Sequence, residues 1–226
     1  MKVIILGAGL GSRLRKPYPK PLTMLTNGSS IMQNQIKQLV RYIDIHDIYV
    51  VVGFKKELIM EAFPDLIYIY NSYFDSTNTS KSLLNGLQKL RGHDVLWLNG
   101  DVVFDHEVIE RVIRHRGSCM AVNTASVAEE EVKYLTNSSG EIIQVSKEVK
   151  NGLGEAVGIN KVCRDDVELL IDKLHQCKDN DYFEKGLELS IGEGLKLFPV
   201  DISDLLCTEV DFKEDLDKVN AELLKR

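Results

Sequence analysis

Apolar residues along the chain follow two periods. Short runs of β-branched and other apolar residues predict strands buried on both faces, whereas apolar residues three and four positions apart predict amphipathic helices. In the first half of the chain these segments alternate, which favours a parallel sheet with helices packed on its faces. Strands are expected at residues 3–6, 47–53, 66–70 and 94–98, and helices at 31–43, 55–63, 81–90 and 106–115.

The order of elements changes beyond about residue 125. Asn137-Ser138-Ser139-Gly140 is a typical hairpin turn between two short strands, so the second half adds antiparallel strands. No linker, repeat or low-complexity stretch divides the two halves. Further strands are expected at 119–125, 133–136, 141–145, 155–161 and 196–200, and further helices at 164–177 and 182–191 and in a last helix that opens at 209–216.

The first strand leads directly into a glycine-rich segment. Its glycines let the backbone approach a ligand closely and adopt positive φ, and Arg13 and Lys20 add positive charge. Lys20 stands between Pro19 and Pro21, which stiffen the chain around it. Bare backbone amides and two cations after a buried strand suit a polyphosphate. A tight turn after a strand is the alternative interpretation of the glycines alone.

Two better-known glycine motifs do not fit this segment. The dinucleotide fingerprint requires a third glycine where this chain has Ser12, and it opens into a helix that the prolines at 17, 19 and 21 forbid. The Gly-Lys-Ser/Thr ending of the P-loop is also absent from the sequence. A dehydrogenase with a Rossmann domain would in addition need an acidic residue at the end of the second strand, and none is evident.

The pattern Gly-x-Gly-x-Gly-Ser-Arg-Leu followed by Pro-Lys-Pro-Leu resembles the signature loop of the nucleotidyltransferases that make nucleotide sugars and related nucleoside-diphosphate compounds. The resemblance implies that Arg13 contacts the outer phosphates of a nucleoside triphosphate and that Lys20 lies by the reacting phosphates. The residues expected to bind the nucleotide in this loop are Leu6, Gly7, Ala8, Gly9, Gly11 and Ser12.

The resemblance also predicts the fold. It extends from residue 2 to about 220 and implies a single Rossmann-like α/β domain over 1–226, with a mixed, mainly parallel sheet flanked by helices and a small antiparallel extension. Residues to about 125 are expected to bind the nucleotide. Residues from about 126 to 226 are expected to bind the acceptor and to supply a metal ligand.

The segment after the third strand is dense in turn and capping residues. In a purely structural interpretation it caps the following helix, with Thr79 or Ser80 as N-cap. The spacing of Asn71, Asn78 and Ser82 is similar to a loop of the cytidylyltransferase branch, which activates phosphocholine and similar small phosphomonoesters. The resemblance implies that these residues contact the pyrimidine and ribose, and amide side chains offer the donors and acceptors that cytosine needs.

Two acidic motifs complete the nucleotide side. Asn99-Gly100-Asp101 ends the fourth strand, at the edge where a parallel sheet binds ligands, and Glu209-Val210-Asp211 opens the last helix. A common turn and a helix cap are their structural alternatives. Both motifs resemble family motifs whose aspartates bind Mg²⁺, so Asp101 and Asp211 are expected to meet at one ion, with Gly100 beside the nucleotide.

Four residues of the second half are expected on the acceptor side. The resemblance implies that Lys147 binds the acceptor phosphate and takes part in catalysis, and that Glu155, Tyr182 and Glu184 contact the acceptor. The structural alternatives are a solvated lysine at a strand end and plain helix packing of the aromatic side chains.

Composition narrows the range of partners. The chain has 34 acidic residues against 28 Lys and Arg, a net charge of −6 that argues against a general nucleic-acid surface. No apolar run approaches the roughly 18 residues of a membrane span, and the run at 3–6 is too short for a signal peptide. The four scattered cysteines are expected to be reduced thiols in a cytoplasmic protein. The oligomeric state stays open, and a homodimer is compatible with the sequence.

These inferences predict a cytoplasmic, Mg²⁺-dependent cytidylyltransferase without nucleic-acid or membrane partners. It would join CMP from CTP to phosphocholine, phosphoethanolamine or an amino-acid phosphate such as phosphoglutamine, releasing pyrophosphate, for decoration of a surface polysaccharide or lipid. The first alternative is a sugar-1-phosphate nucleotidyltransferase using UTP, dTTP or CTP. The second is a non-catalytic nucleotide-binding module, against which the presence of both Asp101 and Asp211 argues.

Overall fold

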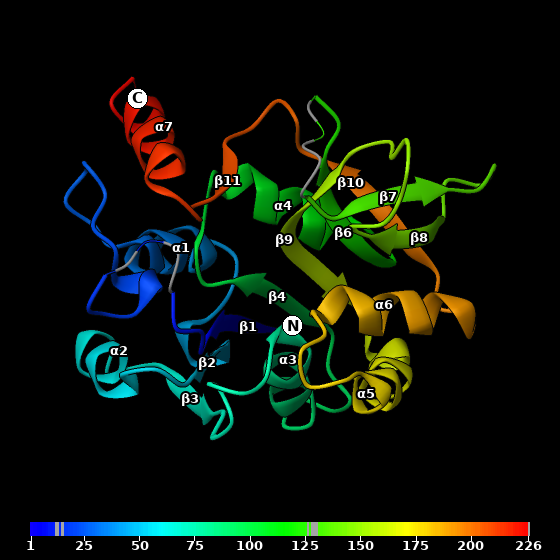
Figure 1. Cartoon of the computed structure of the whole chain (residues 1–226), viewed down its shortest axis with the longest axis horizontal. Helices are drawn as coiled ribbons and strands as arrows, with labels where there is room; N and C mark the ends of the chain where they lie inside the picture. Colours follow the sequence, from blue (N-terminus) through cyan, green and yellow to red (C-terminus); the bar gives the residue numbers. More distant parts are fainter. Residues whose placement is uncertain (12–13, 15, 126, 128–130, 226) are drawn as a thin grey trace.

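The apolar run at the start of the chain forms β1, an inner strand of the sheet (Figure 1). The structure is a computed structural model and describes residues 1–11, 14, 16–125, 127 and 131–225. The main path of the sheet has the order β10–β6–β9–β4–β1–β2–β3. Its strands are β1 (Lys2–Gly7), β2 (Ile48–Val52), β3 (Ile67–Tyr70), β4 (Val95–Asn99), β6 (Ser118–Asn123), β9 (Glu155–Val162) and β10 (Leu197–Asp201).

One strand of this path, β9, runs in the opposite direction to the others. β4, β1, β2 and β3 pair in parallel, as do β10 and β6, and β9 runs antiparallel to its neighbours β4 and β6. The expected hairpin of β7 (Lys133–Thr136) and β8 (Ile142–Ser146) attaches to β9, with Lys133 opposite Glu155. The predicted class of fold, a mixed and mainly parallel sheet with an antiparallel extension, is therefore confirmed.

Side chains of β1 alternate between two cores, as a strand covered on both faces requires. Ile4 and Leu6 pack with α3 (Thr79–Leu87), α5 (Val167–Gln176) and α6 (Phe183–Gly192) on one face. Val3 and Ile5 pack with α1 (Ile31–Leu39), α2 (Lys56–Ala62) and α4 (His106–Arg114) on the other. Short 3₁₀ helices lie at η2 (Lys20–Leu22), η3 (Ile45–Asp47) and η4 (Arg164–Asp166).

Two short strands were absent from the sequence-based expectations. β5 (Val102–Phe104) and β11 (Cys207–Glu209) pair antiparallel, and α7 (Lys213–Leu223) begins only after them. The expectation that Glu209 opens the last helix is therefore wrong, because this residue belongs to a strand. Segments of three residues are too short to display a period of two.

The N-cap of α3 also differs from the expected residue. Asn78, rather than Thr79 or Ser80, is the N-cap, because its side chain accepts a hydrogen bond from the Thr79 amide at 2.8 Å. No helix in the described part of the chain is long and apolar enough to cross a membrane.

Gly100, directly after β4, packs closely against the backbone of β1. Its amide donates to the Leu6 carbonyl at 2.9 Å, and a Cβ at this position would lie 2.8 Å from that oxygen. We expect Gly100→Ala to lower the free energy of unfolding in urea by about 1–3 kcal/mol, because neither strand can move away. Gly9→Ala is the control, since no atom of the described residues lies within 4 Å of a Cβ there. Equal stability of the two variants would contradict the expectation.

Candidate functional site

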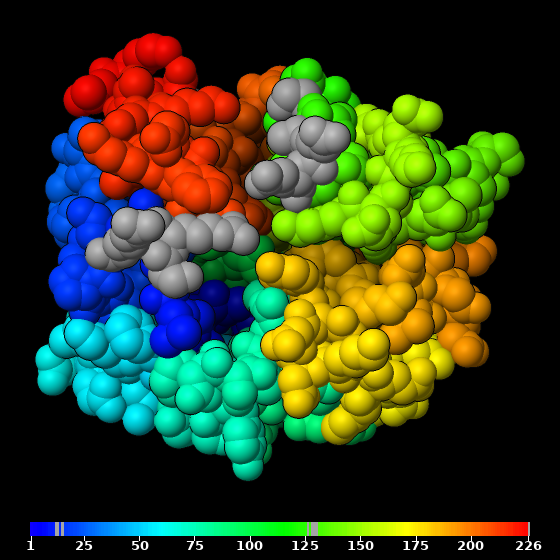
Figure 2. All heavy atoms as spheres, in the orientation of Figure 1, coloured from blue at the N-terminus to red at the C-terminus, as the bar shows by residue number. Residues whose placement is uncertain are grey.

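A cavity of about 300 Å³ opens at the carboxyl ends of β1 and β4, the edge at which sheets of this kind bind ligands. Figure 2 shows the hollow between the dark-blue N-terminal segment, the start of α3 and the yellow segment that leads into α6. Its walls combine glycines with acidic side chains and lysines. The lining residues are Leu6, Gly7, Gly9, Gly11, Lys20, Pro21, Thr79, Asn99, Gly100, Asp101, Glu131, Val132, Lys147, Ala156, Tyr182, Phe183, Glu184, Glu209, Asp211 and Phe212.

Lys20 joins two acidic residues from distant parts of the chain. Its Nζ lies 2.6 Å from Oδ2 of Asp101 and 2.5 Å from Oδ1 of Asp211. Burial of Lys20 disfavours its charged form, but the two carboxylates outweigh burial and raise the pKa of the ammonium above 10.5. Lys20 therefore stays protonated at physiological pH and holds the two carboxylates close together.

The pairing of β5 with β11 brings Asp101 and Asp211 to the same place. Glu209 lies opposite Val102 in this pair, and the Val210 amide donates to the Asp101 carbonyl at 3.0 Å. Asp101 immediately precedes β5 and Asp211 follows β11 by two residues, so the pairing of the two strands holds both aspartates near each other. The predicted meeting of these two residues rests on this small sheet, which sequence periodicity did not reveal.

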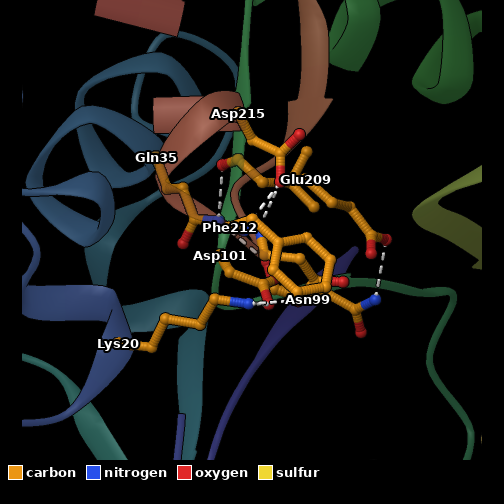
Figure 3. Close-up of polar contacts among 9 residues, drawn as sticks. Lys20, Gln35, Asn99, Asp101, Glu209, Phe212 and Asp215 are labelled. Carbon is orange, nitrogen blue, oxygen red and sulfur yellow. Dashed lines mark hydrogen bonds and ion pairs between the residues drawn. The ribbon is translucent and has the colours of Figure 1, made fainter. Parts of the chain in front are cut away.

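Asp215 fixes the turn that carries Asp211 into α7. Its Oδ2 accepts hydrogen bonds from the backbone amides of Asp211 at 3.0 Å and Phe212 at 2.7 Å (Figure 3). A carboxylate in the first turn of a helix is also favoured by the helix dipole. The position of the Asp211 side chain is therefore set by backbone hydrogen bonds on both sides of it.

Gln35 holds the turn between β4 and β5 from the opposite side. Its Nε2 donates to the carbonyl of Asn99 at 2.8 Å and to that of Val102 at 2.9 Å. The Asn99 side chain in turn donates to Oε1 of Glu209 at 3.0 Å (Figure 3). Burial of that carboxylate raises the pKa of Glu209 well above its usual range, and the nearby charge of Asp101 adds to the effect.

The other end of the cavity holds one lysine and two carboxylates. The Lys147 ammonium lies over the Tyr182 ring, 5.3 Å from its centroid. Glu184 is only 9% exposed, and its Oε2 has no hydrogen-bond partner among the described residues. Burial raises the pKa of Glu184 to about 7, against the opposing influence of Lys147. Burial likewise raises the pKa of Glu131, and the neighbouring Glu155 charge raises it further.

Most of the expected site residues line this one cavity. From the nucleotide side these are Leu6, Gly7, Gly9, Gly11, Lys20, Gly100, Asp101 and Asp211, and from the acceptor side Lys147, Tyr182 and Glu184. Ala8 is buried behind the loop, where its carbonyl accepts from the Phe54 amide, and Glu155 is not among the lining residues although its neighbour Ala156 is. Ser12 and Arg13 lie outside the described residues.

The residues expected to contact the pyrimidine make hydrogen bonds within their own loop. Asn71 donates to the hydroxyls of Ser82 at 3.1 Å and Thr77 at 3.2 Å, and Asn78 caps α3. None of the three expected residues lines the cavity, whereas Thr79 of the same segment does. Asn78 also donates to the carbonyls of Asp179 and Asn180, so the loop is fixed both internally and to the segment before α6, and it borders the cavity through Thr79.

Sequence reasoning assigned no role to four residues that build the site. Asn99 and Glu209 begin the Asn-Gly-Asp and Glu-Val-Asp motifs that contain the two aspartates. Their place in these motifs was the sequence signal from which a role in the site could have been inferred. Glu131 follows two other glutamates, a run that ordinarily indicates a solvated surface, whereas the structure places it half-buried in the cavity wall. Gln35 gave no signal, because a polar residue in an amphipathic helix is ordinarily solvated, yet it is 0% exposed here.

The donor set has the chemistry of a Mg²⁺ site that substrate phosphates complete. Among the described residues no group of three or more His, Cys, Asp or Glu is arranged to hold a metal ion. Oδ1 of Asp101 is buried with no hydrogen-bond partner in the described part of the chain, and Asp211 reaches the same ammonium as Asp101. Mg²⁺ usually takes one or two carboxylates and fills its other positions with water and phosphate oxygens. The two aspartates fit that requirement.

The fold and the cavity define a nucleotidyltransferase. The family of MobA-like NTP transferase domains matches residues 3–179 of the chain, and the chain belongs to this family. Its fold is shared with the CTP:phosphocholine cytidylyltransferase LicC of Streptococcus pneumoniae (TM-score 0.78, 17% identity, 98% of both chains). It is also shared with the inositol-1-phosphate CTP transferase of T. maritima (TM-score 0.81, 17% identity, 97% of this chain and 93% of that one).

Two relatives are more similar in sequence over shorter stretches. The bifunctional protein GlmU of Methanococcus maripaludis strain C7 is 34% identical over 119 residues, which cover 50% of this chain and 28% of that protein. The CMP-5'-(3-aminopropyl)phosphonate synthase of Streptomyces rubellomurinus is 33% identical over 121 residues, covering 50% of this chain and 19% of that protein. The chain thus matches less than a third of the length of either relative.

Glu184 makes the stability of the fold depend on pH. The folded state binds the Glu184 proton more tightly than the unfolded chain, so stability falls as pH rises from about 4.5 to about 7. We expect Glu184→Gln to raise the free energy of unfolding by on the order of 2 kcal/mol at pH 8 and by less at pH 5. Urea denaturation at the two pH values measures this difference.

The partly exposed Glu188 of the same helix, paired with Lys185, provides the control. Glu188→Gln should shift stability little and equally at both pH values. A Glu184→Gln variant that is no more stable than the wild type at pH 8 would contradict the assignment of a buried, uncompensated carboxylate.

Proposed function

We propose that the protein transfers CMP from CTP to a small phosphorylated acceptor, with release of pyrophosphate and with Mg²⁺ as cofactor. One observation carries the proposal. Lys20 lies between Asp101 and Asp211 in a cavity that also exposes the glycines of the first loop. A single cavity thus offers a cation, metal-binding oxygens and close backbone approach, which together suit a triphosphate.

The transfer needs no general base in this proposal. A phosphate oxygen of the acceptor attacks the α-phosphorus of CTP, the bond to the oxygen that bridges to the β-phosphorus breaks, and pyrophosphate leaves. The acceptor oxygen is already anionic, so catalysis consists of positioning and charge neutralisation. Lys20 neutralises charge at the α-phosphate, and Lys147 holds the incoming phosphate. Arg13, with the amides of its loop, is proposed to hold the outer phosphates.

Asp101 and Asp211 are the residues that would hold Mg²⁺. When bound, the ion neutralises negative charge on the triphosphate. Asn99 and Gln35 are positioning residues, because their hydrogen bonds hold the Asn99-Gly100-Asp101 turn and Glu209. The buried, unpartnered Oδ1 of Asp101 supports this assignment.

CTP is the proposed nucleotide. Support comes from the sequence spacing of residues 71–82, which resembles a cytidylyltransferase loop, and from two proteins of the same fold, the CTP:phosphocholine cytidylyltransferase and the inositol-1-phosphate CTP transferase. Phosphocholine, phosphoethanolamine and amino-acid phosphates are the proposed acceptors, and the phosphonate synthase among the relatives adds phosphonates of similar size. We place the reaction in the cytoplasm and its product in the decoration of a surface polysaccharide or lipid.

A sugar-1-phosphate nucleotidyltransferase is the second candidate. GlmU is among the relatives, and the fold is also shared with a putative glucose-1-phosphate thymidylyltransferase from Bacillus anthracis (TM-score 0.77, 16% identity, 98% of this chain and 94% of that one). This candidate uses the same cavity and differs in the nucleotide and acceptor.

The carboxylates and Lys20 are expected to be essential for turnover. We expect Asp101→Asn and Lys20→Ala each to lower kcat by at least about 10³-fold, because each removes charge where the transition state is most negative. Circular dichroism should show an intact fold in both variants. Asp65→Asn and Lys37→Ala, both on the exposed surface, are the matched controls and should retain full activity. Normal turnover in either site variant would overturn the assignment.

Pyrophosphate release in the presence of Mg²⁺ tests the proposal. CTP, UTP, dTTP, ATP and GTP are each combined with phosphocholine, phosphoethanolamine, phosphoglutamine and sugar 1-phosphates. The proposal predicts a signal with CTP and a small non-sugar acceptor. A signal confined to UTP or dTTP with a sugar phosphate would establish the second candidate, and a protein that binds none of the nucleotides would overturn both.

A further inference from the structure

The acceptor end of the cavity contains a buried carboxylate, one oxygen of which has no hydrogen-bond partner among the described residues. Glu184 is the second residue of α6, and its side chain lines the cavity while remaining nine-tenths buried. Its Oε2 accepts no hydrogen bond from any described residue. A buried carboxylate oxygen without a donor is costly, and native structures rarely leave one so unless a ligand supplies the donor.

Charge at this end of the cavity is also unbalanced. Glu131 and Glu184 both line it, and Lys147 is the nearby cation that acts on the ionisation of each. In the proposed reaction Lys147 binds the acceptor phosphate. The positive charge of Lys147 is then no longer available to compensate Glu131 and Glu184. A positive charge on the acceptor itself would restore the balance.

The aromatic side chains of the cavity do not form a cage for a quaternary ammonium. Phe183 is 1% exposed and packs edge-on against Trp97, with ring centroids 5.7 Å apart. Tyr182 is 42% exposed but has the Lys147 ammonium over its ring, and Phe212 follows Asp211 near the nucleotide end. Recognition of a trimethylammonium group relies on several open aromatic faces, because that group has no N–H to donate.

We propose that the acceptor carries a primary ammonium group, which donates hydrogen bonds to Glu184 while Lys147 binds the phosphate or phosphonate at its other end. The proposal rests on the proposed nucleotidyl transfer and deepens it by naming the chemical class of acceptor. A hydroxyl at the same place would donate one hydrogen bond but leave the charge of Glu184 uncompensated. A trimethylammonium group would supply charge but no hydrogen bond, so only the primary amine satisfies both requirements.

Matched acceptors test the proposal. The kcat/KM values are measured with CTP for 2-aminoethyl phosphate, its alcohol analogue 2-hydroxyethyl phosphate, and phosphocholine, and for the 3-aminopropyl and 3-hydroxypropyl phosphates and the corresponding phosphonates. We expect the best amine to exceed its own alcohol analogue and phosphocholine by about 10- to 100-fold, the range of a charged hydrogen bond. A wild-type enzyme that prefers phosphocholine or an alcohol would overturn the proposal.

Glu184→Gln supplies the second readout. The neutral amide keeps the size of the side chain and removes its charge, so the ratio of amine to alcohol kcat/KM should fall by about tenfold or more. Glu188→Gln, on the same helix, should keep the wild-type ratio. An unchanged ratio in Glu184→Gln would assign amine recognition to another residue and overturn the role of Glu184.

Calorimetry separates failure of this inference from failure of the proposed function. The 2- and 3-carbon amines and alcohols are titrated into the protein with Mg²⁺ and a CTP analogue that has a methylene bridge between the α- and β-phosphorus atoms. Amine-selective binding without turnover of any acceptor would overturn the proposed transfer and support the inference. Turnover without amine preference would overturn only the inference, and absence of both binding and turnover would overturn both.

Discussion

The contact of Lys20 with two carboxylates is the interaction on which the site depends. A buried ammonium is stable only when opposite charge surrounds it, and here that charge comes from the end of β4 and from the turn after β11. The pairing of β5 with β11 brings Asp101 and Asp211 together, and the cation between them offsets the repulsion of their like charges. The salt bridges therefore organise in advance the carboxylate oxygens that are proposed to hold Mg²⁺. They also place a cation where the proposed reaction accumulates negative charge.

The acceptor end of the cavity follows the opposite principle. There Glu184 is held without a full set of partners, at a cost in stability that the pKa of about 7 reflects. Such groups persist where function requires them, and the same carboxylate is the proposed partner of the acceptor ammonium. One cavity thus combines a compensated charge cluster, proposed to bind the nucleotide, with an uncompensated one, proposed to bind the acceptor.

The sequence allowed most of the sheet to be predicted, because its long apolar segments carry a clear period. It did not show β5 and β11, which are too short for one, and so Glu209 was assigned to a helix although it lies in a strand. The meeting of Asp101 and Asp211 was expected from family resemblance alone, and the pairing of these strands supplies its physical basis. Gln35 could not have been found, since its role depends on two carbonyls brought to it by the fold.

The central claim is that Asp101, Asp211 and Lys20 form a site for a CTP–Mg²⁺ complex. Isothermal titration of the methylene-bridged CTP analogue into the wild-type protein, with Mg²⁺ and with Mg²⁺ removed by a chelator, tests it most directly. The account predicts binding that is at least about tenfold tighter with Mg²⁺, because the carboxylates repel a bare triphosphate. Equal affinity under the two conditions, or no binding in either, would contradict it.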